Sequence, residues 1–492
     1  MNITPPKRIA ALVLALLFVL SCITAAACSG SGGKTDGTSP ASDVTEAATE
    51  ETAGKPTHNL PDKDFGGKEV MFLTELNTGF DWYTSKEIYA EEQNGELFND
   101  TVYNRNVIIE DKYNLKIAQT QLSSASNAAK NSLTANDTVY DVVMSYINPT
   151  LPLAQQGFLL DLHDVPYLDL EQPWWDQRAN ENLTINGKLF ITTGDISILD
   201  NECTMVMFFN KDIIEDYKLE SPYDLVKSNG WTIDKVGEMS VGITSDINGD
   251  GILNNDDLWG ISIAGNAPIS FYFSLGERVA KNNSAGELEL VMDGKRTSQA
   301  VEKIMNLCLN ELVLSPHTGK SDFNNACVAF NDKRILFTTF ALVDINGLRD
   351  AEFEFGILPY PLYDENQDSY NNLISSGLVS STSVPYNCKD TEIVGFLLEA
   401  LAFYSVDTLT VAYYDNALKT RYIRDDESAD MLDIIFATRV YDLGFIFNWG
   451  GAGQLITTMF NSKKTEFASS YAAIAEKAQT EMQKTIDAFG KF

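Results

Sequence analysis

The sequence predicts an α/β protein whose folded body consists of two lobes. Strand-like and helix-like segments alternate between residues 68 and 146, in the order expected for a parallel sheet with crossover helices. About 430 residues follow the polar N-terminal region, which is more than one hydrophobic core usually serves. With 44% hydrophobic and 11% aromatic residues, the chain can fill two such cores.

The first lobe is predicted from apolar periodicity. The helix expected over residues 96–113 carries apolar side chains at spacings of four, seven and four, which place them on one helix face: Phe98, Val102, Ile109 and Tyr113. Strands are expected over residues 68–76, 114–122 and 141–146, and a short helix is expected over residues 126–133.

The alternation continues in the second half of the chain. A strand is expected over residues 204–210, and a helix starts directly after it at Lys211. The remaining helices are expected over residues 231–239, 300–312 and 469–489, and the remaining strands over residues 335–339 and 355–359. The chain contains no internal repeat.

The N-terminus has the order of regions of a secretory signal peptide. Two basic residues precede an apolar run over residues 9–20, and small residues then lead to Cys28. This run is too short for a transmembrane span. The Ala-Ala-Ala-Cys junction resembles a bacterial lipobox, although Ala25 stands where leucine is usual, and Cys22 ends a poorer match. We expect residues 1–27 to be a signal peptide and Cys28 to be lipidated; a secreted form and an uncleaved anchor are the alternatives.

Residues 28–61 are expected to be the lipidated N-terminus and a disordered tether. They are rich in Ser, Gly, Thr, Ala and Pro and have no apolar periodicity, so they cannot bury enough surface to fold. This layout predicts a protein held at the extracellular face of the cell membrane by an acyl chain such as palmitate. Removing the leader takes away Lys7 and Arg8 and no acid, which changes the formal net charge from −33 to −35. Such an acidic chain is not expected to bind nucleic acid or an anionic membrane surface.

The sequence contains no signature of a metal-dependent or nucleophilic enzyme. There are three histidines in the chain, and no GxSxG, HExxH or phosphate-binding loop occurs. The cysteines beyond the leader show no metal-ligand or redox spacing, and free buried thiols are favoured over one or two disulfides: Cys203, Cys308, Cys327 and Cys388. The sequence does not exclude a glycoside hydrolase, which needs a pair of carboxylates, because a chain with 69 acidic residues contains such pairs by chance.

Several passages from Asp64 onward follow one another in a characteristic order. They are residues 94–96 (NGE) leading to 113–115 (YNL), 141–143 (DVV), 153–159 (LAQQGFL), 173–176 (PWWD), 186–190 (NGKLF), 208–211 (FFNK), 330–337 (FNDKRILF) and 355–361 (FGILPYP). In this order they resemble the bacterial extracellular solute-binding proteins of family 1, the group that includes maltose-binding protein. Each passage is a scaffold pattern, and their common order carries the resemblance.

The resemblance implies a two-lobe, periplasmic-binding-protein-like fold with discontinuous lobes and a hinge. The chain would cross between lobes near residues 193–202, 361–375 and 415–424. Lobe 1 would comprise residues 62–194 and 375–415, and lobe 2 residues 195–361 and 424–492. A small molecule would bind in the cleft, and closure around it would create the form that the permease subunits of an ABC importer recognise. The protein is expected to act as a monomer.

Residues 246–257 (DINGDGILNNDD) match a calcium-binding loop. Side-chain oxygens are expected at positions one, three and five, a backbone carbonyl at seven and an acid at twelve, from Asp246, Asn248, Asp250, Ile252 and Asp257. A glycine at position six permits the sharp turn. We expect a structural calcium ion; the alternative is a polar, glycine-rich turn that holds no metal. A dockerin is not expected, because dockerins need two such loops.

Aromatic and acidic residues near expected strand ends are the candidate ligand-binding residues. Sugars present flat C–H faces to aromatic rings and hydroxyls to acids and amides, and binding sites are built on loops after strands. The candidates are Trp82, Tyr83, Tyr146, Trp175, Asp195, Asp200 and Trp449, whereas Trp231 and Trp259 are assigned to packing. The sequence therefore predicts a binding protein that delivers a mono- or oligosaccharide to an ABC importer. A surface glycoside hydrolase and an adhesive or scaffolding lipoprotein are the alternatives.

Overall fold

The computed structural model describes residues 57–413 and 425–491, apart from residues 264, 320 and 349. Residues His58–Phe492 form one compact unit. The predicted signal peptide, Cys28, most of the tether and the third predicted crossing at residues 415–424 lie outside the described residues. No helix in the described part of the chain has the length and apolar character needed to cross a bilayer.

The first sheet has the strand order β11-β3-β1-β2. Its members are β1 (Lys68–Glu75), β2 (Leu115–Leu122), β3 (Val142–Tyr146) and β11 (Ser380–Ser383). Strand β1 is parallel to both β2 and β3, with α1 (Leu97–Tyr113) and α2 (Ala125–Thr134) as the crossover helices. This confirms the parallel arrangement predicted for the first lobe. Strand β11 joins antiparallel to β3, so the sheet is completed by a segment from late in the chain.

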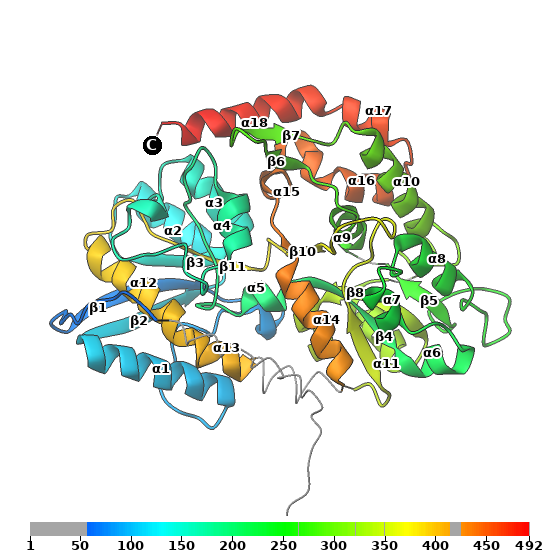
Figure 1. Cartoon of the computed structure of the whole chain (residues 1–492), viewed down its shortest axis with the longest axis horizontal. Helices are drawn as coiled ribbons and strands as arrows, with labels where there is room; N and C mark the ends of the chain where they lie inside the picture. Colours follow the sequence, from blue (N-terminus) through cyan, green and yellow to red (C-terminus); the bar gives the residue numbers. More distant parts are fainter. Residues whose placement is uncertain (1–56, 264, 320, 349, 414–424, 492) are drawn as a thin grey trace, which may run out of the picture. The chain divides into compact units, whose positions relative to one another are not determined.

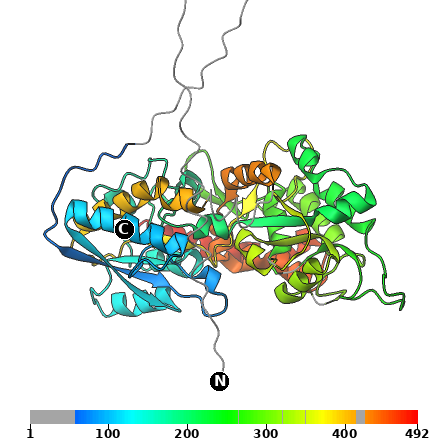
Figure 2. The same cartoon turned by 90° about the horizontal axis from the view of Figure 1, so that it is seen from below.

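Local signals explain why α1 forms where it does. Val102, Ile109 and Tyr113 are buried on one face, as their spacing predicts. The helix ends at Asn114, whose left-handed conformation (φ 48°) caps it. On the sheet, α1 lies beside α12 (Thr391–Val406) in both views of the molecule, and the Tyr113 ring packs on Phe396 at 4.7 Å (Figures 1 and 2).

The second sheet has the order β5-β8-β4-β9. Its strands are β4 (Met205–Asn210), β5 (Trp259–Ser262), β8 (Ile335–Ala341) and β9 (Phe355–Leu358), and every residue in them is buried. Strand β4 is antiparallel to both β8 and β9, whereas β5 is parallel to β8. The helices of this region are α6 (Lys211–Tyr217), α7 (Pro222–Lys227), α8 (Ile233–Val241), α9 (Ala267–Ser274), α10 (Lys295–Cys308), α11 (Phe323–Asn331) and α14 (Asp426–Ala437) (Figure 1).

Shorter elements connect the two sheets. After β3 the chain forms α3 (Ile147–Gln155), η2 (Leu162–Asp164), α4 (Gln177–Leu183) and α5 (Leu199–Glu202) before it enters β4. It returns through β10 (Asn372–Leu373), which pairs with β12 (Arg439–Val440). The remaining elements are η1 (Asp81–Tyr83), β6 (Ala280–Asn282), β7 (Leu288–Leu290), η3 (Leu342–Gly347) and α13 (Leu409–Val411).

The C-terminal region begins with α15 (Leu443–Phe447), η5 (Trp449–Gln454) and α16 (Leu455–Asn461). The single helix expected over residues 469–489 is two helices, α17 (Phe467–Ala472) and α18 (Ala475–Phe489), and α18 packs on η5 and α3.

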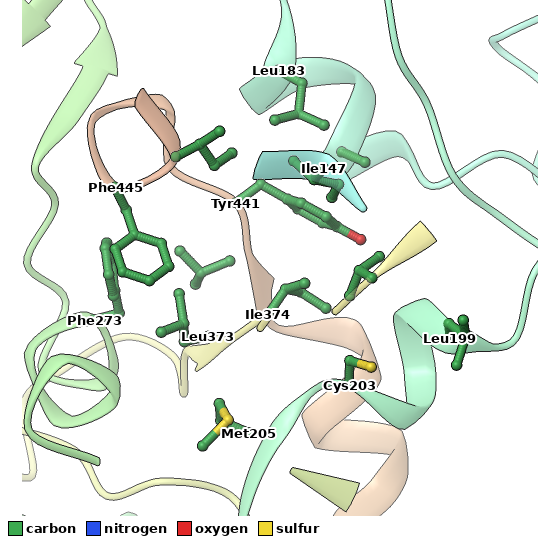
Figure 3. Close-up of a cluster of buried hydrophobic side chains, with 14 of the residues drawn as sticks. Ile147, Leu183, Leu199, Cys203, Met205, Phe273, Leu373, Ile374, Tyr441 and Phe445 are labelled. Atoms are coloured by element: carbon green, nitrogen blue, oxygen red, sulfur yellow. The ribbon is translucent and has the colours of Figure 1, made fainter. Parts of the chain in front are cut away.

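One continuous apolar core links the two sheets. Figure 3 shows its middle, where Cys203 from the outgoing connection lies near Ile374 from the returning one. Met205 at the start of β4 extends this cluster into the second sheet. The four cysteines beyond the leader are unpaired, in agreement with the favoured prediction of free thiols.

Candidate functional site

A cavity of about 520 Å³ opens beyond the carboxyl end of β1. Three groups of residues line it: the segment after β1 and the start of α1 (Trp82, Thr84, Ser85, Lys86, Glu87, Tyr89, Asn94, Glu96, Phe98 and Asn99), the end of β2 (Gln119 and Gln121), and residues from the connections and the second half of the chain (Ile198, Leu199, Glu202, Asn346 and Tyr413). Because the carboxyl ends of parallel strands meet at one sheet edge, the topology alone places polar loop residues here. The volume is in the range of small-molecule sites.

Three of the predicted ligand-binding residues, Trp82, Tyr83 and Tyr146, lie close together, and Trp82 is the one of them that lines this cavity. Trp82 lines it, and its ring lies 4.9 Å from that of Phe80. Tyr146, at the end of β3, donates a hydrogen bond to the backbone oxygen of Tyr83 at 3.1 Å. It also accepts one from the Asn77 amide at 3.1 Å. The loop after β1 is therefore held in place by the end of β3.

The same loop contacts the elements on either side of β8 in the second sheet, α11 before it and η3 after it. The Tyr83 hydroxyl donates to the Asp344 carboxylate in η3 at 2.6 Å, and the rings of Phe80 and Phe323 lie 5.5 Å apart. Burial raises the pKa of Asp344 to about 6, while the hydrogen bonds from Tyr83 and Ala341 lower it. Tyr83 therefore joins the two halves of the molecule next to the cavity.

Two acidic residues that are buried or half-buried in the cavity wall, Glu87 and Glu202, were not among the sequence candidates. The Glu87 carboxylate is buried and accepts hydrogen bonds from the hydroxyls of Ser85 and Ser197, both at 2.8 Å. The buried Arg105 guanidinium donates to the backbone oxygen of Glu87 at 2.5 Å. Burial, followed by the nearby Glu87, raises the pKa of Glu202 to about 8. Nothing in the local sequence distinguishes these two acids from the many others.

Asp195 and Asp200 lie in a neighbouring buried cluster, the Arg439 cluster, instead of lining the cavity. Its members are Asp176, Asp195, Asp200, Arg439 and Tyr441. The Arg439 guanidinium pairs with Asp176 at 2.8 Å and with Asp200 at 3.4 Å, and Tyr441 donates to Asp176 at 2.8 Å. Thr410 donates to Asp195 at 3.0 Å. Burial raises the pKa of Asp195 to about 6 and that of Asp200 to about 7, although Arg439 opposes both shifts.

Trp175 and Trp449 are buried away from the cavity lining. The indole N–H groups of Trp174 and Trp175 both donate to the Glu399 carboxylate at 3.0 Å. Trp449 donates to Thr485 at 2.9 Å and stacks on Phe447 at 5.3 Å. In this structure these rings satisfy their polar atoms within the protein. A ligand contact from either ring stays a prediction.

The calcium-loop match forms a tight polar loop between α8 and β5. Asp246 accepts from the backbone amides of Gly249 at 2.6 Å and Gly251 at 2.8 Å, and both glycines have positive φ (75° and 80°). Asp257, at position twelve, is buried and accepts from the amides of Ile247 and Asn254. The oxygen types fit calcium, since Asn248 and the carbonyl of position seven complete the set. Counting only His, Cys, Asp and Glu, no group of three among the described residues is arranged to hold a metal.

Comparison with solved structures identifies the class of fold. The chain is similar to a cyclo/maltodextrin-binding protein complexed with maltotetraose (TM-score 0.58, 11% identity, covering 85% of this chain and 98% of that one). It is also similar to apo RafE from Streptococcus pneumoniae (0.53, 16%, 83% and 97%) and to the maltodextrin-binding domain MalE from Bdellovibrio bacteriovorus bound to maltotriose (0.53, 14%, 85% and 100%). The fold is that of two-lobe periplasmic solute-binding proteins, as the sequence predicts.

The family model of the bacterial extracellular solute-binding proteins matches residues 90–405. The chain belongs to this family, which confirms the resemblance drawn from the sequence. No curated protein matches the sequence.

Proposed function

We propose that this protein is the lipid-anchored, ligand-capturing component of an ABC importer and that its ligand is a mono- or oligosaccharide bound in the Trp82 cavity. The observation that carries the proposal is the cavity itself. Its lining comes from the segment after β1 and also from Asn346 in η3, so both halves of the chain contribute to one small-molecule-sized space. Family membership supports a binding role, and permease subunits would be the membrane partners. We propose a monomer.

The chemistry of the lining supports a carbohydrate. Trp82 offers a flat apolar ring, and amide side chains can exchange hydrogen bonds with hydroxyls: Asn94, Asn99, Gln119, Gln121 and Asn346. Two of the proteins with a similar fold hold maltotetraose and maltotriose.

A thermal-shift screen of the compact unit His58–Phe492 against mono- and oligosaccharides tests the proposal. A ligand at 100 times its Kd should stabilise the fold by about 2.7 kcal/mol, which raises Tm by a few degrees. A hit without breakdown of the sugar supports the proposal. Turnover of a chromogenic glycoside would instead establish the hydrolase alternative, and a flat screen would remove the carbohydrate assignment.

Replacing Trp82 with alanine should weaken binding of the sugar found in this screen by about 10- to 100-fold, because the stacking ring is lost. Trp82→Phe, which keeps an aromatic face, should lose less. Tyr386→Ala removes an exposed ring that does not line the cavity and serves as the matched control. Isothermal titration calorimetry measures all three variants, and an unchanged Kd for Trp82→Ala would place the ligand elsewhere.

The membrane anchor is tested by Cys28→Ser. If Cys28 carries the lipid, this variant loses its acyl chain and should move from the membrane fraction to the medium. Cys22→Ser is the matched control and should stay in the membrane fraction. Fractionation followed by intact-mass measurement checks the result. Retention of Cys28→Ser at the membrane would contradict lipidation at this residue.

Calcium in the loop of residues 246–257 is proposed as a structural clip. With the affinities usual for extracellular calcium modules, about 10 mM calcium should stabilise the fold by about 1.4–2.7 kcal/mol relative to chelator. Asp246→Ala should abolish this gain, because it removes the first ligand. Differential scanning calorimetry with magnesium as the control ion measures the effect. Equal Tm values in calcium and chelator would show that the loop is a polar turn without metal.

A further inference from the structure

Glu202 is an acidic side chain of the cavity wall that the protein leaves without a partner. Glu202 ends α5, lines the cavity and is half-buried. No hydrogen bond or ion pair to its carboxylate occurs among the described residues. The neighbouring Glu87 differs, since its carboxylate is satisfied by Ser85, Ser197 and the backbone amide of Ile198. The third acid of the lining, Glu96, is exposed, so Glu202 is the half-buried carboxylate that remains open to a ligand.

The charges around Glu202 do not balance it. Burial is the main cause that raises its pKa, and repulsion from Glu87 and Asp200 acts in the same direction. Of the described residues that line the cavity, Lys86 is the one Lys or Arg, and its ammonium is paired with Asp81 at 2.5 Å. Lys86 lowers the pKa of Glu202 but does not offset burial and Glu87. A ligand that brings its own positive charge would therefore favour the ionised form of Glu202.

A second polar atom in the same wall also has no partner. The Gln119 side-chain oxygen is buried and accepts no hydrogen bond. Glu202 and Gln119 offer acceptors without a donor, whereas the buried Trp82 indole N–H in the same wall is a donor without an acceptor. A buried polar group without a partner destabilises the protein. A ligand with an ammonium group and hydroxyls could relieve all three, since the ammonium donates and a hydroxyl can both donate and accept.

We propose that the ligand of this cavity carries a positively charged amino group that pairs with Glu202, and that the ligand class is an amino-bearing saccharide; this inference rests on the proposed function. An ammonium supplies three donors and a charge, and charge-assisted hydrogen bonds are stronger than neutral ones. The Trp82 ring and the amide side chains serve the sugar portion. A metal ion is a weaker match for this charge, because the described part of the chain holds no group of three metal ligands among its His, Cys, Asp and Glu side chains.

The test compares three series of oligosaccharides that share length and linkage: β-1,4-linked glucosamine, its N-acetylated form and glucose. Calorimetry on the full chain should show the amino series binding at least about tenfold more tightly than the other two, which is 1.4 kcal/mol. Glu202→Gln should remove this preference, and Glu202→Asp, which keeps the charge on a shorter side chain, should retain part of it. Glu171→Gln removes one exposed charge that does not line the cavity and should bind like the parent protein.

Two outcomes overturn the inference: neutral oligomers binding as tightly as amino oligomers, or an amino preference that persists in Glu202→Gln. If none of the three series binds while another sugar from the thermal-shift screen does, the amino assignment is wrong and the carbohydrate proposal stands. If no sugar binds at all, both are wrong.

Discussion

Replacing Arg439 with methionine should destabilise the folded protein by about 3–5 kcal/mol at pH 8. The guanidinium is nearly enclosed, and it pairs with Asp176 and Asp200, which are both buried. Its loss would leave two carboxylates in the interior without a counter-charge, and removing one partner of a buried pair costs far more than the pair itself contributes. Urea unfolding followed by tryptophan fluorescence measures the change.

Two comparisons isolate the cause of this loss. Lys227→Met removes a cation whose partner, Asp430, is exposed, so its effect should be small. The triple variant Arg439→Met, Asp176→Asn, Asp200→Asn should recover part of the lost stability, because no unpaired charge remains. A loss from Arg439→Met no larger than that from Lys227→Met would show that water or a rearranged neighbour satisfies the cluster.

The first sheet could be predicted from the sequence because its signals are local. The α1 face, its asparagine cap and the short apolar strands β1 and β3 each depend on neighbouring residues. Strand β11 could not be predicted in this way. Its four residues, Ser380–Ser383, are all polar, and all four are buried. The hydroxyls of Ser381 and Ser383 donate to backbone oxygens of β3, so a strand distant in the sequence satisfies two of these four polar side chains.

The direction of the strands in the second sheet was likewise beyond a local analysis. A fully buried strand such as β4, MVMFFN, is a continuous apolar run, which is typical of parallel strands in α/β proteins. Here its two neighbours are antiparallel to it. Whether two neighbouring strands are parallel or antiparallel depends on the path that the chain takes between them. An apolar run within one strand carries no information on that path.

The same limit applies to the site. Trp82 and Trp175 are the same residue type and both precede polar segments, but one lines the cavity and the other is buried on Glu399. What separates them is the position of residues more than two hundred positions away in the sequence. Glu202 and Arg439 were missed for a related reason. Their roles follow from the charges that the fold brings near them, and neither residue lies in a recognisable motif.

The free energy of unfolding should fall by about 2–3 kcal/mol or more as the pH rises from 5 to 8. Burial is the first cause that raises the pKa of several carboxyl groups, among them Asp195 and Asp344 to about 6, Asp200 and Glu399 to about 7, and Glu202 to about 8. In the unfolded chain these groups titrate near pH 4. Between pH 4 and 7 the folded state therefore binds more protons than the unfolded state, and its stability decreases as the pH rises.

Substitution at these positions tests whether the buried carboxyls cause the slope. Asp200→Asn and Glu399→Gln remove the titration of one group each, so each should flatten the pH dependence of stability. Asp100→Asn is the matched control, because backbone hydrogen bonds lower the pKa of this exposed acid and its contribution falls below pH 4. Urea unfolding at four pH values measures all three.

A free energy of unfolding that rises between pH 5 and 8 would contradict this prediction. It would mean that these carboxyl groups are charged in the folded protein and have hydrogen-bond donors or cations beside them. The carboxylates of the Arg439 cluster would then be charged at pH 5 as well as at pH 8. Arg439→Met would therefore lower the free energy of unfolding by the same amount at both pH values.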